Sequence, residues 1–568
     1  MILADDKNDF GVRTDHLDYL TEVVAIADDS LGILHIYSDY PDYEYVHPPK
    51  EGIACVDDAA RGVVAYLKHY ESTGREKSLR LAKHLLQFVF YMQAHDGGFY
   101  NFVWQDYSRN RLGETSHNNG FTWWACRAVW AMGYARYQFG AWDSEPSLRD
   151  TIDVRMERAL GKLARQKWTP NQWQNLGRFK VPAAHWMLDG WVNKTSELTL
   201  GLVYYAAATG NGSAASLARQ LCDGITNSQI GDRYTYPYGL FPDGLHDIAM
   251  WHAWGSREVQ ALAMASQILP DPKEDWSIVA KRAADNFYTH MLLTDRITRM
   301  QSIPFNETQI NYDMAPVVNG LVELYRLTCD EIYAQKAALF AAWWFGDNPL
   351  EVNMYDQESG RFFDGITGER WNRNSGGETN TEGIMALLDV QSLGEYSNLV
   401  FAYVRSYQPV ISLEAEEAEI VAGKPQITTA ESYGSASISG SEYVQLVAGD
   451  TMRLKFTVEN SYDQQTYYFL ELHHLVGDDS AQITCLIDGE VIGRTSGGKQ
   501  AERHFWITPI PERVRLADGT HTLTLTTANE SGMSAVDMLR IHPVVERKTW
   551  VTPEGEPIEF ERRLMENR

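Results

Sequence analysis

Six pairs of helix-forming segments repeat between residues 57 and 393. The first segment of each pair is apolar around most of its circumference. A short break, often Thr-Gly or Thr-Cys-Asp, separates it from a second segment with one apolar stripe and one charged side. Apolar positions three and four residues apart are typical of α-helices. Each pair therefore predicts a helical hairpin.

The two kinds of helix predict two layers. A helix that is apolar all round has to be buried, whereas a helix with a single apolar stripe covers it from outside. Short breaks make the two members of a pair antiparallel neighbours, and the variable loops between pairs exclude a solenoid of fixed period. We expect a closed (α/α)6 toroid whose long loops gather at one end. Its inner helices are expected to begin near Asp57, Gly120, Lys194, Trp251, Tyr312 and Glu378.

The helical period stops near Tyr407, where short alternating runs replace it. Segments such as EYVQLV, TMRLKFTV and AQITCLIDG alternate apolar and polar residues between Gly, Asp, Ser and Asn. Short alternating strands at this spacing predict a β-sandwich, here of the jelly-roll type. We expect an (α/α)6 toroid over residues 1–408, a β-sandwich over 409–546 and a loosely packed C-terminal tail over 547–568.

Charge and composition narrow the range of partners. The 568-residue chain carries a formal net charge of −26. Nucleic acids and anionic membranes attract proteins through Lys and Arg, so neither is expected as a partner. No apolar run is long enough to span a bilayer. The N-terminus contains acidic residues where a signal peptide would have a basic segment and then an apolar one. We expect a soluble protein, cytoplasmic as the sequence stands and secreted if a signal peptide has been removed.

The five cysteines are odd in number and widely spaced. They form no CxxC pair, and the chain has no HExxH segment, so neither a disulfide framework nor a zinc motif is recognised. We expect reduced thiols packed as small apolar groups.

Acidic residues gather at the first and last of the predicted inner helices. Asp57 and Asp58 open the first helix, and Glu378 and Glu382 lie one turn apart on the sixth. Closing the ring makes these two helices neighbours, so the four carboxyl groups are expected to face one hollow. Each acid would also suit a plain capping or first-turn position, where the helix dipole favours negative charge.

Two carboxyl groups with different roles are what hydrolysis of a glycosidic bond requires. One stays protonated and gives its proton to the leaving oxygen, and the other activates water or attacks the sugar. Crowded carboxyl groups at a partly desolvated site have pKa values that are pushed apart, which allows both roles near neutral pH. Asp313 and Glu197, on the fifth and third predicted inner helices, are further candidates.

Aromatic and hydrogen-bonding residues fall in the loops that should surround the hollow. Flat aromatic faces pack on the apolar faces of sugar rings, and polar neighbours bind the hydroxyl groups. Some tryptophans are equally suited to filling the core of a thick toroid. A tyrosine-rich run at residues 234–238 is expected at the same mouth. The candidate sugar-binding residues are His117, Trp124, Trp251, His252, Trp254, Tyr312, Asp313, Arg373 and Asn374.

Six hairpins with acids at the inner helix N-termini resemble the six-hairpin, (α/α)6-barrel glycosidases and their relatives among polysaccharide lyases and sugar epimerases. The resemblance covers roughly residues 14–407. Within that group, FGDNPLEVNMYD followed by a Glu-bearing inner helix is similar to the family 9 cellulase pattern. This similarity implies a water-activating role for Asp57 or Asp58, in CVDDAARG. It implies an acid role for Glu378 or Glu382.

The β-rich part is similar to carbohydrate-binding modules of the EAE type. The similarity lies in SLEAEEAEIV and in GTHTLTLTTANESGMSAVDMLRIHPV. In such modules these acids hold a structural calcium ion, which implies Ca²⁺ at Glu414, Glu416 and Asp537. Carboxylate oxygens are suitable ligands for that hard cation. No cofactor is expected for catalysis.

The sequence therefore favours a glycoside hydrolase acting on a neutral oligo- or polysaccharide. It would be inverting if its two carboxyl groups lie roughly 6.5–9.5 Å apart, and retaining if they lie about 5 Å apart. A polysaccharide lyase using His252, Tyr312 and Arg373 is an alternative, as is a sugar epimerase using His252 and His117. A sugar-binding protein without catalysis is another. The sugar, the linkage, exo or endo action and the oligomeric state stay open.

Overall fold

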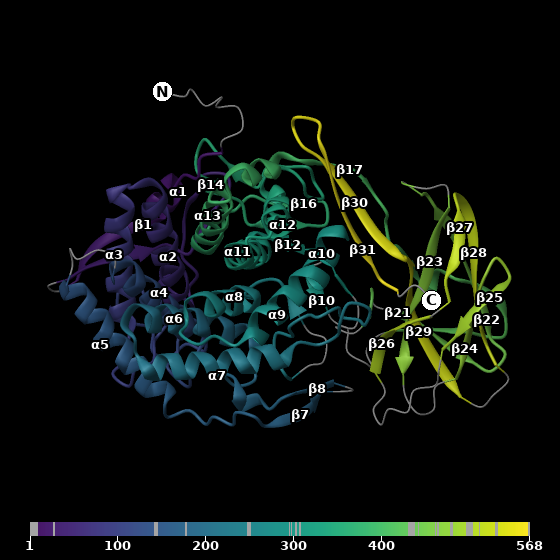
Figure 1. The fold of residues 1–568 in the computed structure, drawn as a ribbon, viewed down its shortest axis with the longest axis horizontal. Helices are drawn as coiled ribbons and strands as arrows, with labels where there is room; N and C mark the ends of the chain where they lie inside the picture. The colour runs from purple at the N-terminus through teal and green to yellow at the C-terminus, as the bar shows by residue number, and fades with distance from the viewer. Residues whose placement is uncertain are drawn as a thin grey trace. The chain divides into compact units, whose positions relative to one another are not determined.

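The chain divides into two compact units. The first comprises residues 1–230, 239–288 and 307–402, and the second comprises residues 231–238, 289–306 and 403–568. Figure 1 shows helices throughout the first unit and mainly strands in the second. The computed structural model describes residues 10–565 apart from 27–28, 141–145, 177–178, 247–250, 295, 297, 301–303, 306–307, 430–437, 441, 461, 463–464, 477–480, 496–503, 511 and 529–531.

Six helices form a closed ring in the first unit, which confirms the predicted toroid (Figure 1). Each inner helix packs against the next, and the last packs back on the first. Ring closure therefore joins segments that lie far apart in the sequence. The inner helices are α2 (Val56–Thr73), α4 (Trp123–Gly140), α6 (Val192–Thr209), α8 (Glu258–Ile268), α11 (Asn311–Thr328) and α13 (Gly377–Gln391).

An outer layer covers this ring. Burial follows the predicted difference between the layers: every residue from Val192 to Ala206 of α6 is buried, whereas α3 buries one face. The sixth partner is a 3-10 helix, η4 (Gly394–Phe401), rather than an α-helix. The other outer helices are α3 (Glu76–Met92), α5 (Pro146–Leu163), α7 (Gly212–Ser228), α9 (Glu274–Ala283) and α12 (Glu331–Ala341).

The breaks within the hairpins are helix C-caps. Gly74 ends α2 and Gly210 ends α6 in the left-handed region, with φ of 68° and 69°. Their N–H groups donate to the carbonyls of Tyr70 and Ala206. Cys329 has φ of 55° at the end of α11 and caps it in the same way. Thr-Gly and Thr-Cys-Asp are thus stop signals that satisfy the last carbonyls.

The fourth inner helix begins later than predicted. It starts at Glu258 rather than at Trp251, because Gly255 adopts a left-handed φ of 81° that interrupts the helical backbone. Trp251 lies instead in a short strand, β9 (Trp251–His252). The aromatic residues expected on this helix therefore precede it in a loop.

Short strands line the connections of the first unit. Three of them lead directly into inner helices: β5 into α2, β12 into α11, and β16 towards α13. With α1 (Asp15–Leu20), these elements are β1 (Thr21–Ile26), β2 (Asp29–Leu34), β3 (Tyr37–Asp39), β4 (Glu44–Val46), β5 (Ala54–Cys55), β6 (Phe102–Val103), β7 (Trp173–Leu176), β8 (Phe179–Pro182), β12 (Thr308–Ile310), β13 (Tyr355–Asp356), β14 (Arg361–Phe362), β15 (Gly365–Thr367) and β16 (Arg370–Asn372).

Two antiparallel sheets in the second unit confirm the predicted β-sandwich. Leu454 and Leu523 of one sheet share a core cluster with Leu470 and Leu539 of the other. The seven-stranded sheet contains β18 (Ile411–Glu414), β20 (Gln426–Thr429), β21 (Glu442–Val447), β23 (Gln465–Val476), β26 (His504–Pro509), β27 (Val514–Ala517) and β29 (Met533–Pro543). The five-stranded sheet contains β19 (Glu419–Ala422), β22 (Thr451–Val458), β24 (Ile483–Ile487), β25 (Glu490–Arg494) and β28 (Gly519–Thr527).

Residues 547–565 are not the loose tail that the sequence predicted. β30 (Val545–Val551) pairs with β31 (Pro557–Arg563) and with β17 (Tyr403–Tyr407) in an antiparallel sheet. Trp550 is fully buried. The segment forms alternating strands although it carries many charges. The hydrogen bonds between these strands and the buried indole of Trp550 hold the segment in place. The second unit also contains α10 (Thr289–Leu293), β10 (Arg299–Met300) and β11 (Pro304–Phe305).

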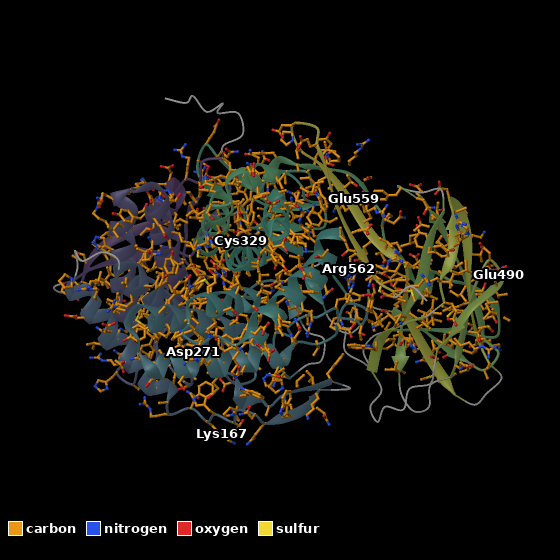
Figure 2. The ribbon with its side chains drawn as sticks, viewed as in Figure 1. Lys167, Asp271, Cys329, Glu490, Glu559 and Arg562 are labelled. Carbon is orange, nitrogen blue, oxygen red and sulfur yellow. The ribbon has the colours of Figure 1, made fainter. Side chains whose placement is uncertain are left out.

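All five cysteines are free thiols. Four are buried, and Cys329, labelled in Figure 2, is exposed between α11 and α12. Within the described part of the chain, no helix is long and apolar enough to cross a membrane.

The crossing of α4 and α6 depends on two glycines. A Cβ added at Gly133 would lie 2.1 Å from the carbonyl oxygen of Gly201, and one at Gly201 would lie 2.5 Å from the backbone of Val129. We predict that Gly201→Ala lowers the free energy of unfolding by at least the roughly 1–3 kcal/mol typical of overpacking. Urea unfolding followed by circular dichroism measures it.

The matched control is Gly161→Ala in the outer helix α5. Its Cβ would meet only the end of Arg165, at 3.9 Å. This variant should be neutral or gain about 0.5–1 kcal/mol from helix propensity. Equal stability changes in the two variants would contradict the close crossing.

Candidate functional site

A pocket of about 350 Å³ opens at the N-terminal ends of α2, α11 and α13. Five of the predicted site residues line it: Asp57, Asp58, Tyr312, Asn374 and Glu378. The pocket also contains residues that the sequence analysis did not select, namely Tyr37, Asp39, Glu51, Arg61, Asn101 and Asp364. Most of these lie in loops or hairpins, where no periodic pattern indicates which side chains turn inward.

Arg61 links the first and last inner helices beneath this pocket. Its guanidinium donates to Asp58 Oδ1 at 2.7 Å and to Glu378 Oε1 at 2.6 Å, and Glu382 Oε1 lies 3.6 Å away. Arg61 lies one helical turn after Asp58, so the DDxxR spacing could have identified it. These ion pairs hold carboxyl groups of the first and last inner helices close together at the ring seam, the place where α13 packs on α2.

Two further arginines extend this ion-pair network below the pocket. Arg127 pairs with Asp57 Oδ2 at 2.7 Å and with Glu197 Oε2 at 2.9 Å, and it donates to the Tyr312 hydroxyl at 2.8 Å. Arg257 contacts Glu382 Oε2 at 2.5 Å. All three guanidinium groups are buried, and each has a carboxylate partner.

Asp57 and Asp58 differ in their electrostatic surroundings although they are adjacent. Burial raises the pKa of Asp58 to about 7; it outweighs the attraction of Arg61, and the neighbouring Glu378 and Asp57 act in the same direction as burial. Burial also acts to raise the pKa of Asp57, but Arg127 and Arg61 outweigh it and the pKa is lowered. Near neutral pH the pocket thus holds one carboxylate beside one carboxyl group that binds a proton.

The other two predicted catalytic acids are placed differently from each other. The side chain of Glu378 is 46% exposed, so one side of it can meet a ligand while the other meets Arg61. Glu382 is completely buried between Arg61 and Arg257. A carboxylate in that position cannot contact a substrate, because two guanidinium groups and the helix ring enclose it. Glu382 instead links Arg61 and Arg257 below the pocket, and we call this buried layer of ion pairs the floor of the pocket.

Three additional acids lie near the site. Asp313 accepts the Ile310 N–H at 2.7 Å and caps α11, and burial raises its pKa. Glu197 is buried beneath Arg127 and accepts the Tyr312 hydroxyl at 2.9 Å. Asp364 lines the pocket and accepts the Thr379 hydroxyl at 2.5 Å, and burial raises its pKa as well. Asp313 therefore acts as a cap rather than as a pocket residue.

The predicted aromatic mouth is only partly present. Trp124 and Trp251 are 8% and 1% exposed, and Trp251 packs edge-on against Phe287. Neither can stack on a sugar, because the large indoles fill the toroid core. Trp254 is 50% exposed and stacks on His252, with ring centroids 4.0 Å apart. His252 in turn contacts Asp243 Oδ2 through Nε2 at 3.1 Å.

The remaining predicted residues have structural contacts. The His117 ring packs against the edge of Trp124, with centroids 5.6 Å apart, and its Nδ1 accepts the Asn119 N–H. The Arg373 guanidinium lies 4.1 Å from the Tyr40 ring centroid and 4.7 Å from that of Trp371. Asn374 accepts the Tyr40 N–H at 3.1 Å.

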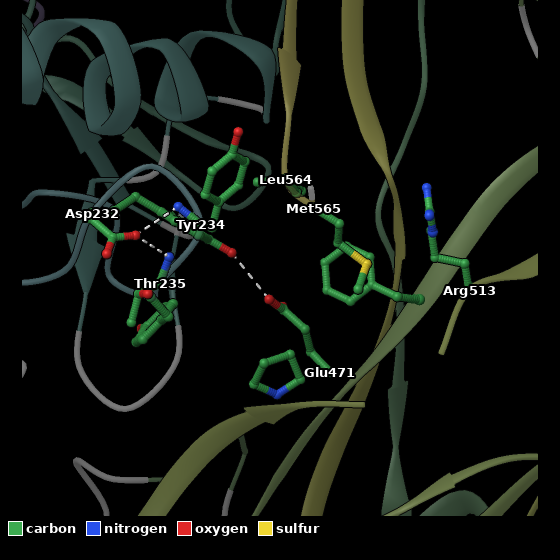
Figure 3. Close-up of a pocket in the computed structure, with 11 residues that line it drawn as sticks. Asp232, Tyr234, Thr235, Glu471, Arg513, Leu564 and Met565 are labelled. Carbon is green, nitrogen blue, oxygen red and sulfur yellow. Dashed lines mark hydrogen bonds between the residues drawn. The ribbon is translucent and has the colours of Figure 1, made fainter. Parts of the chain in front are cut away.

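The tyrosine run at residues 234–238, expected at the mouth of the toroid, belongs to the second unit. Figure 3 shows it beside a pocket of about 440 Å³ in that unit. Asp232 holds the backbone N–H groups of Tyr234 and Thr235 at 2.9 Å, and the Tyr238 hydroxyl donates to Glu471 at 3.1 Å. The interpretation of these tyrosines as part of the toroid mouth was wrong, because the loop that carries them groups with the sandwich.

The three residues assigned to calcium lie near one another in the sandwich. Glu414 accepts the Ser439 hydroxyl at 2.7 Å, and Asp537 accepts the Ser439 N–H and contacts His473 Nδ1 at 2.6 Å. Burial raises the pKa of Glu416 to about 7, and Glu414 and Asp537 add to it. The buried Oε2 atoms of Glu414 and Glu416 have no hydrogen-bond partner in the described structure. These two residues fit a hard cation, whereas the oxygens of Asp537 are already engaged.

Comparison with known proteins gives structural similarities only. No protein-family model and no curated protein matches the sequence. A sugar epimerase from a ruminal bacterium is similar at a TM-score of 0.48 and 14% identity, over 67% of this chain and 95% of its own. A cellobiose 2-epimerase from Bacillus thermoamylovorans has a TM-score of 0.47 and 11% identity, over 64% and 93%. A family 36 carbohydrate-binding module, in complex with calcium and xylotriose, has a TM-score of 0.18 and 15% identity, over 23% and 98%.

The raised pKa of Asp58 has a consequence for stability. The native state holds this proton more tightly than the unfolded chain, so the contribution of Asp58 falls as the pH rises from about 4 to about 7. We predict that the stability difference between Asp58→Asn and the wild type shifts in favour of the variant across this range, by at most about 1.4 kcal/mol per pH unit. Urea unfolding at several pH values measures it. A difference that does not depend on pH would contradict the protonated state.

Proposed function

We propose that the toroid is a carbohydrate-active enzyme that hydrolyses a glycosidic bond by carboxyl chemistry in the pocket at the ring seam. The supporting observation is the pair formed by Asp57 and Asp58, whose pKa values are shifted in opposite directions at one pocket. Carboxyl groups with separated pKa values supply an acid and a base at the same pH. The assignment concerns this chain's own residues and does not depend on the similar structures.

In this proposal each carboxyl group has a separate task. Asp58, protonated near neutral pH, gives its proton to the leaving oxygen of the sugar. Asp57, kept ionised by Arg127, takes a proton from water or attacks the sugar carbon. Glu378, half exposed and fixed by Arg61, holds a sugar hydroxyl at the rim. Asp39, Glu51 and Asp364 add negative charge to the lining, which favours a neutral sugar over a uronate.

The structure argues against the lyase alternative. A lyase needs a base with an accessible proton-accepting atom, for which the sequence offered Tyr312 and His252, and Tyr312 does not suit this role. Its hydroxyl donates to Glu197 and accepts from Arg127, and burial raises its pKa well above the ordinary value. Arg373, the predicted partner of a uronate, stacks on aromatic rings instead.

Amidation of the acids tests the proposal. On neutral oligosaccharides, Asp58→Asn and Asp57→Asn should each lower kcat by about 100-fold or more, since general acid–base catalysis contributes roughly 10²–10⁴-fold. Asp389→Asn is the control: it removes a buried carboxylate from an ion pair with Lys68 on the same toroid, outside the pocket. Reducing-end release per folded molecule, with folding checked by circular dichroism, is the measurement. Full activity in both pocket variants would refute the assignment.

The pH dependence of the reaction follows from the same pair. Activity should require Asp57 ionised and Asp58 protonated, so kcat/KM is expected to stay high below about pH 7 and to fall above it. On the acidic side, the fall in kcat/KM should occur at a pH below the usual pKa range of an aspartate, because the pKa of Asp57 is lowered. The pH profile of the wild type is the measurement. A rate that increases steadily from pH 6 to pH 9 would exclude Asp58 as the acid.

Sugar epimerisation or isomerisation is the second candidate, and one observation favours it. His252 is held by the buried carboxylate of Asp243 and stacks on the exposed Trp254. An imidazole oriented by a carboxylate is a suitable base for removing a proton next to a sugar carbonyl. This is also the activity in the names of two similar solved structures.

Solvent deuterium separates the two candidates. An epimerase would incorporate deuterium into the sugar without releasing new reducing ends, and His252→Ala would abolish the exchange. A hydrolase would release reducing ends, and the same variant would retain the carboxyl-dependent reaction. Mass analysis of products from a panel of free sugars and oligosaccharides records both outcomes.

A further inference from the structure

Three metal-ligating side chains that take no part in the proposed reaction converge inside the second unit. They are His290 on α10, His542 on β29 and Glu546 on β30, and all three are buried. One donor atom from each lies within 4.8 Å of the other two. His542 and Glu546 lie four residues apart, whereas His290 comes from a distant part of the chain, so the sequence alone does not bring the three together.

The hydrogen bonding of His542 leaves a lone pair directed at its neighbours. Its Nδ1 lies 3.4 Å from the carbonyl oxygen of Pro543 and donates to it in the tautomer that carries the proton on Nδ1. Its Nε2 then carries a lone pair 3.7 Å from Glu546 Oε1, and it has no hydrogen-bond partner in the described structure. Two acceptor atoms facing each other without a proton between them are the arrangement that a cation stabilises.

His290 completes the set from the other side. Its Nδ1 lies 2.5 Å from the same Oε1 of Glu546. The Nε2 atom of His290 also lacks a hydrogen-bond partner among the described residues. Two ligand atoms of one tetrahedral ion lie roughly 3.3 Å apart, so Nδ1 and Oε1 would separate by about 0.8 Å when an ion binds between them.

Neighbouring residues hold the carboxylate in a monodentate position. Arg562, labelled in Figure 2, donates to Glu546 Oε2 at 3.1 Å and leaves Oε1 for the cluster. The same guanidinium lies 4.1 Å from the ring centroid of Tyr238, whose edge packs on His290. Ligating carboxylates and histidines in metal sites are oriented by such outer hydrogen bonds and packing.

We propose that His290, His542 and Glu546 bind a divalent ion of the zinc type that fastens α10 (Thr289–Leu293) to the strands that carry His542 and Glu546. Two nitrogen ligands and one oxygen ligand select Zn²⁺, Co²⁺ or Ni²⁺ over Ca²⁺ and Mg²⁺. This site is separate from the calcium ligands predicted in the sandwich.

Zn²⁺ binding to the whole chain is the test. Protein stripped with a chelator should bind one Zn²⁺ per chain by calorimetry, with a rise in the midpoint of thermal unfolding. Co²⁺ bound in its place should give visible absorption bands of a low-coordinate site, and Ca²⁺ should not compete. Absence of stoichiometric Zn²⁺ binding by the folded wild type would overturn the proposal and show a plain hydrogen-bond cluster.

Variants assign the ligands. His542→Gln should weaken Zn²⁺ binding by more than about 100-fold, beyond the roughly 10–100-fold typical of an outer-shell change such as Arg562→Gln. His474→Gln is the matched control, because His474 is a buried histidine of the same unit that bonds Thr508 at 3.0 Å. Unchanged Zn²⁺ affinity in His542→Gln, or equal loss in His474→Gln, would contradict the assignment. If His542→Gln does not fold, the Co²⁺ spectrum of the wild type decides, because an ion bound octahedrally by water and surface carboxylates absorbs far more weakly than one in a low-coordinate site.

Discussion

The buried guanidinium of Arg61 is the interaction on which the rest of the toroid site depends. It bonds Asp58 on its own helix and reaches across the ring seam to Glu378 and Glu382 on α13. Removing one partner of a buried ion pair leaves an uncompensated charge, typically at a cost of about 3–5 kcal/mol. Arg61 and Glu378 lie 317 positions apart in the sequence. They are therefore held together by the same balance of charges that shapes the pocket.

This balance also determines which carboxyl groups are available for chemistry. Glu382 and Glu197 are enclosed by arginines and form the floor, whereas Asp57, Asp58 and Glu378 line the pocket. Arg127 keeps Asp57 ionised, and burial raises the pKa of Asp58 to about 7, so that only Asp58 retains part of its proton near neutral pH. Two adjacent aspartates thereby acquire different roles through their partners, since their helix positions alone would make them alike.

The two-layer toroid and the sandwich could be predicted because the spacing of apolar residues along a helix or a strand is a local property of the sequence. Helix stops at Gly74 and Gly210 and the strand alternation after Tyr407 follow from side-chain chemistry alone. The direction of single side chains depends on packing and could not be predicted in this way. Trp251 enters the core, Glu382 lies below the floor, and the loop with Tyr234 joins the other unit. Loop acids such as Asp364 gave no periodic signal.

Titration of the Asp58 carboxyl group tests the central claim most directly. Carbon-13 carboxyl NMR of labelled protein, with the signal assigned by its absence in Asp58→Asn, follows one acid through the pH range. The charge balance at the seam predicts a midpoint of about 7 for Asp58, with Asp57 already ionised. A midpoint near 4, the value of an ordinary exposed aspartate, would contradict it.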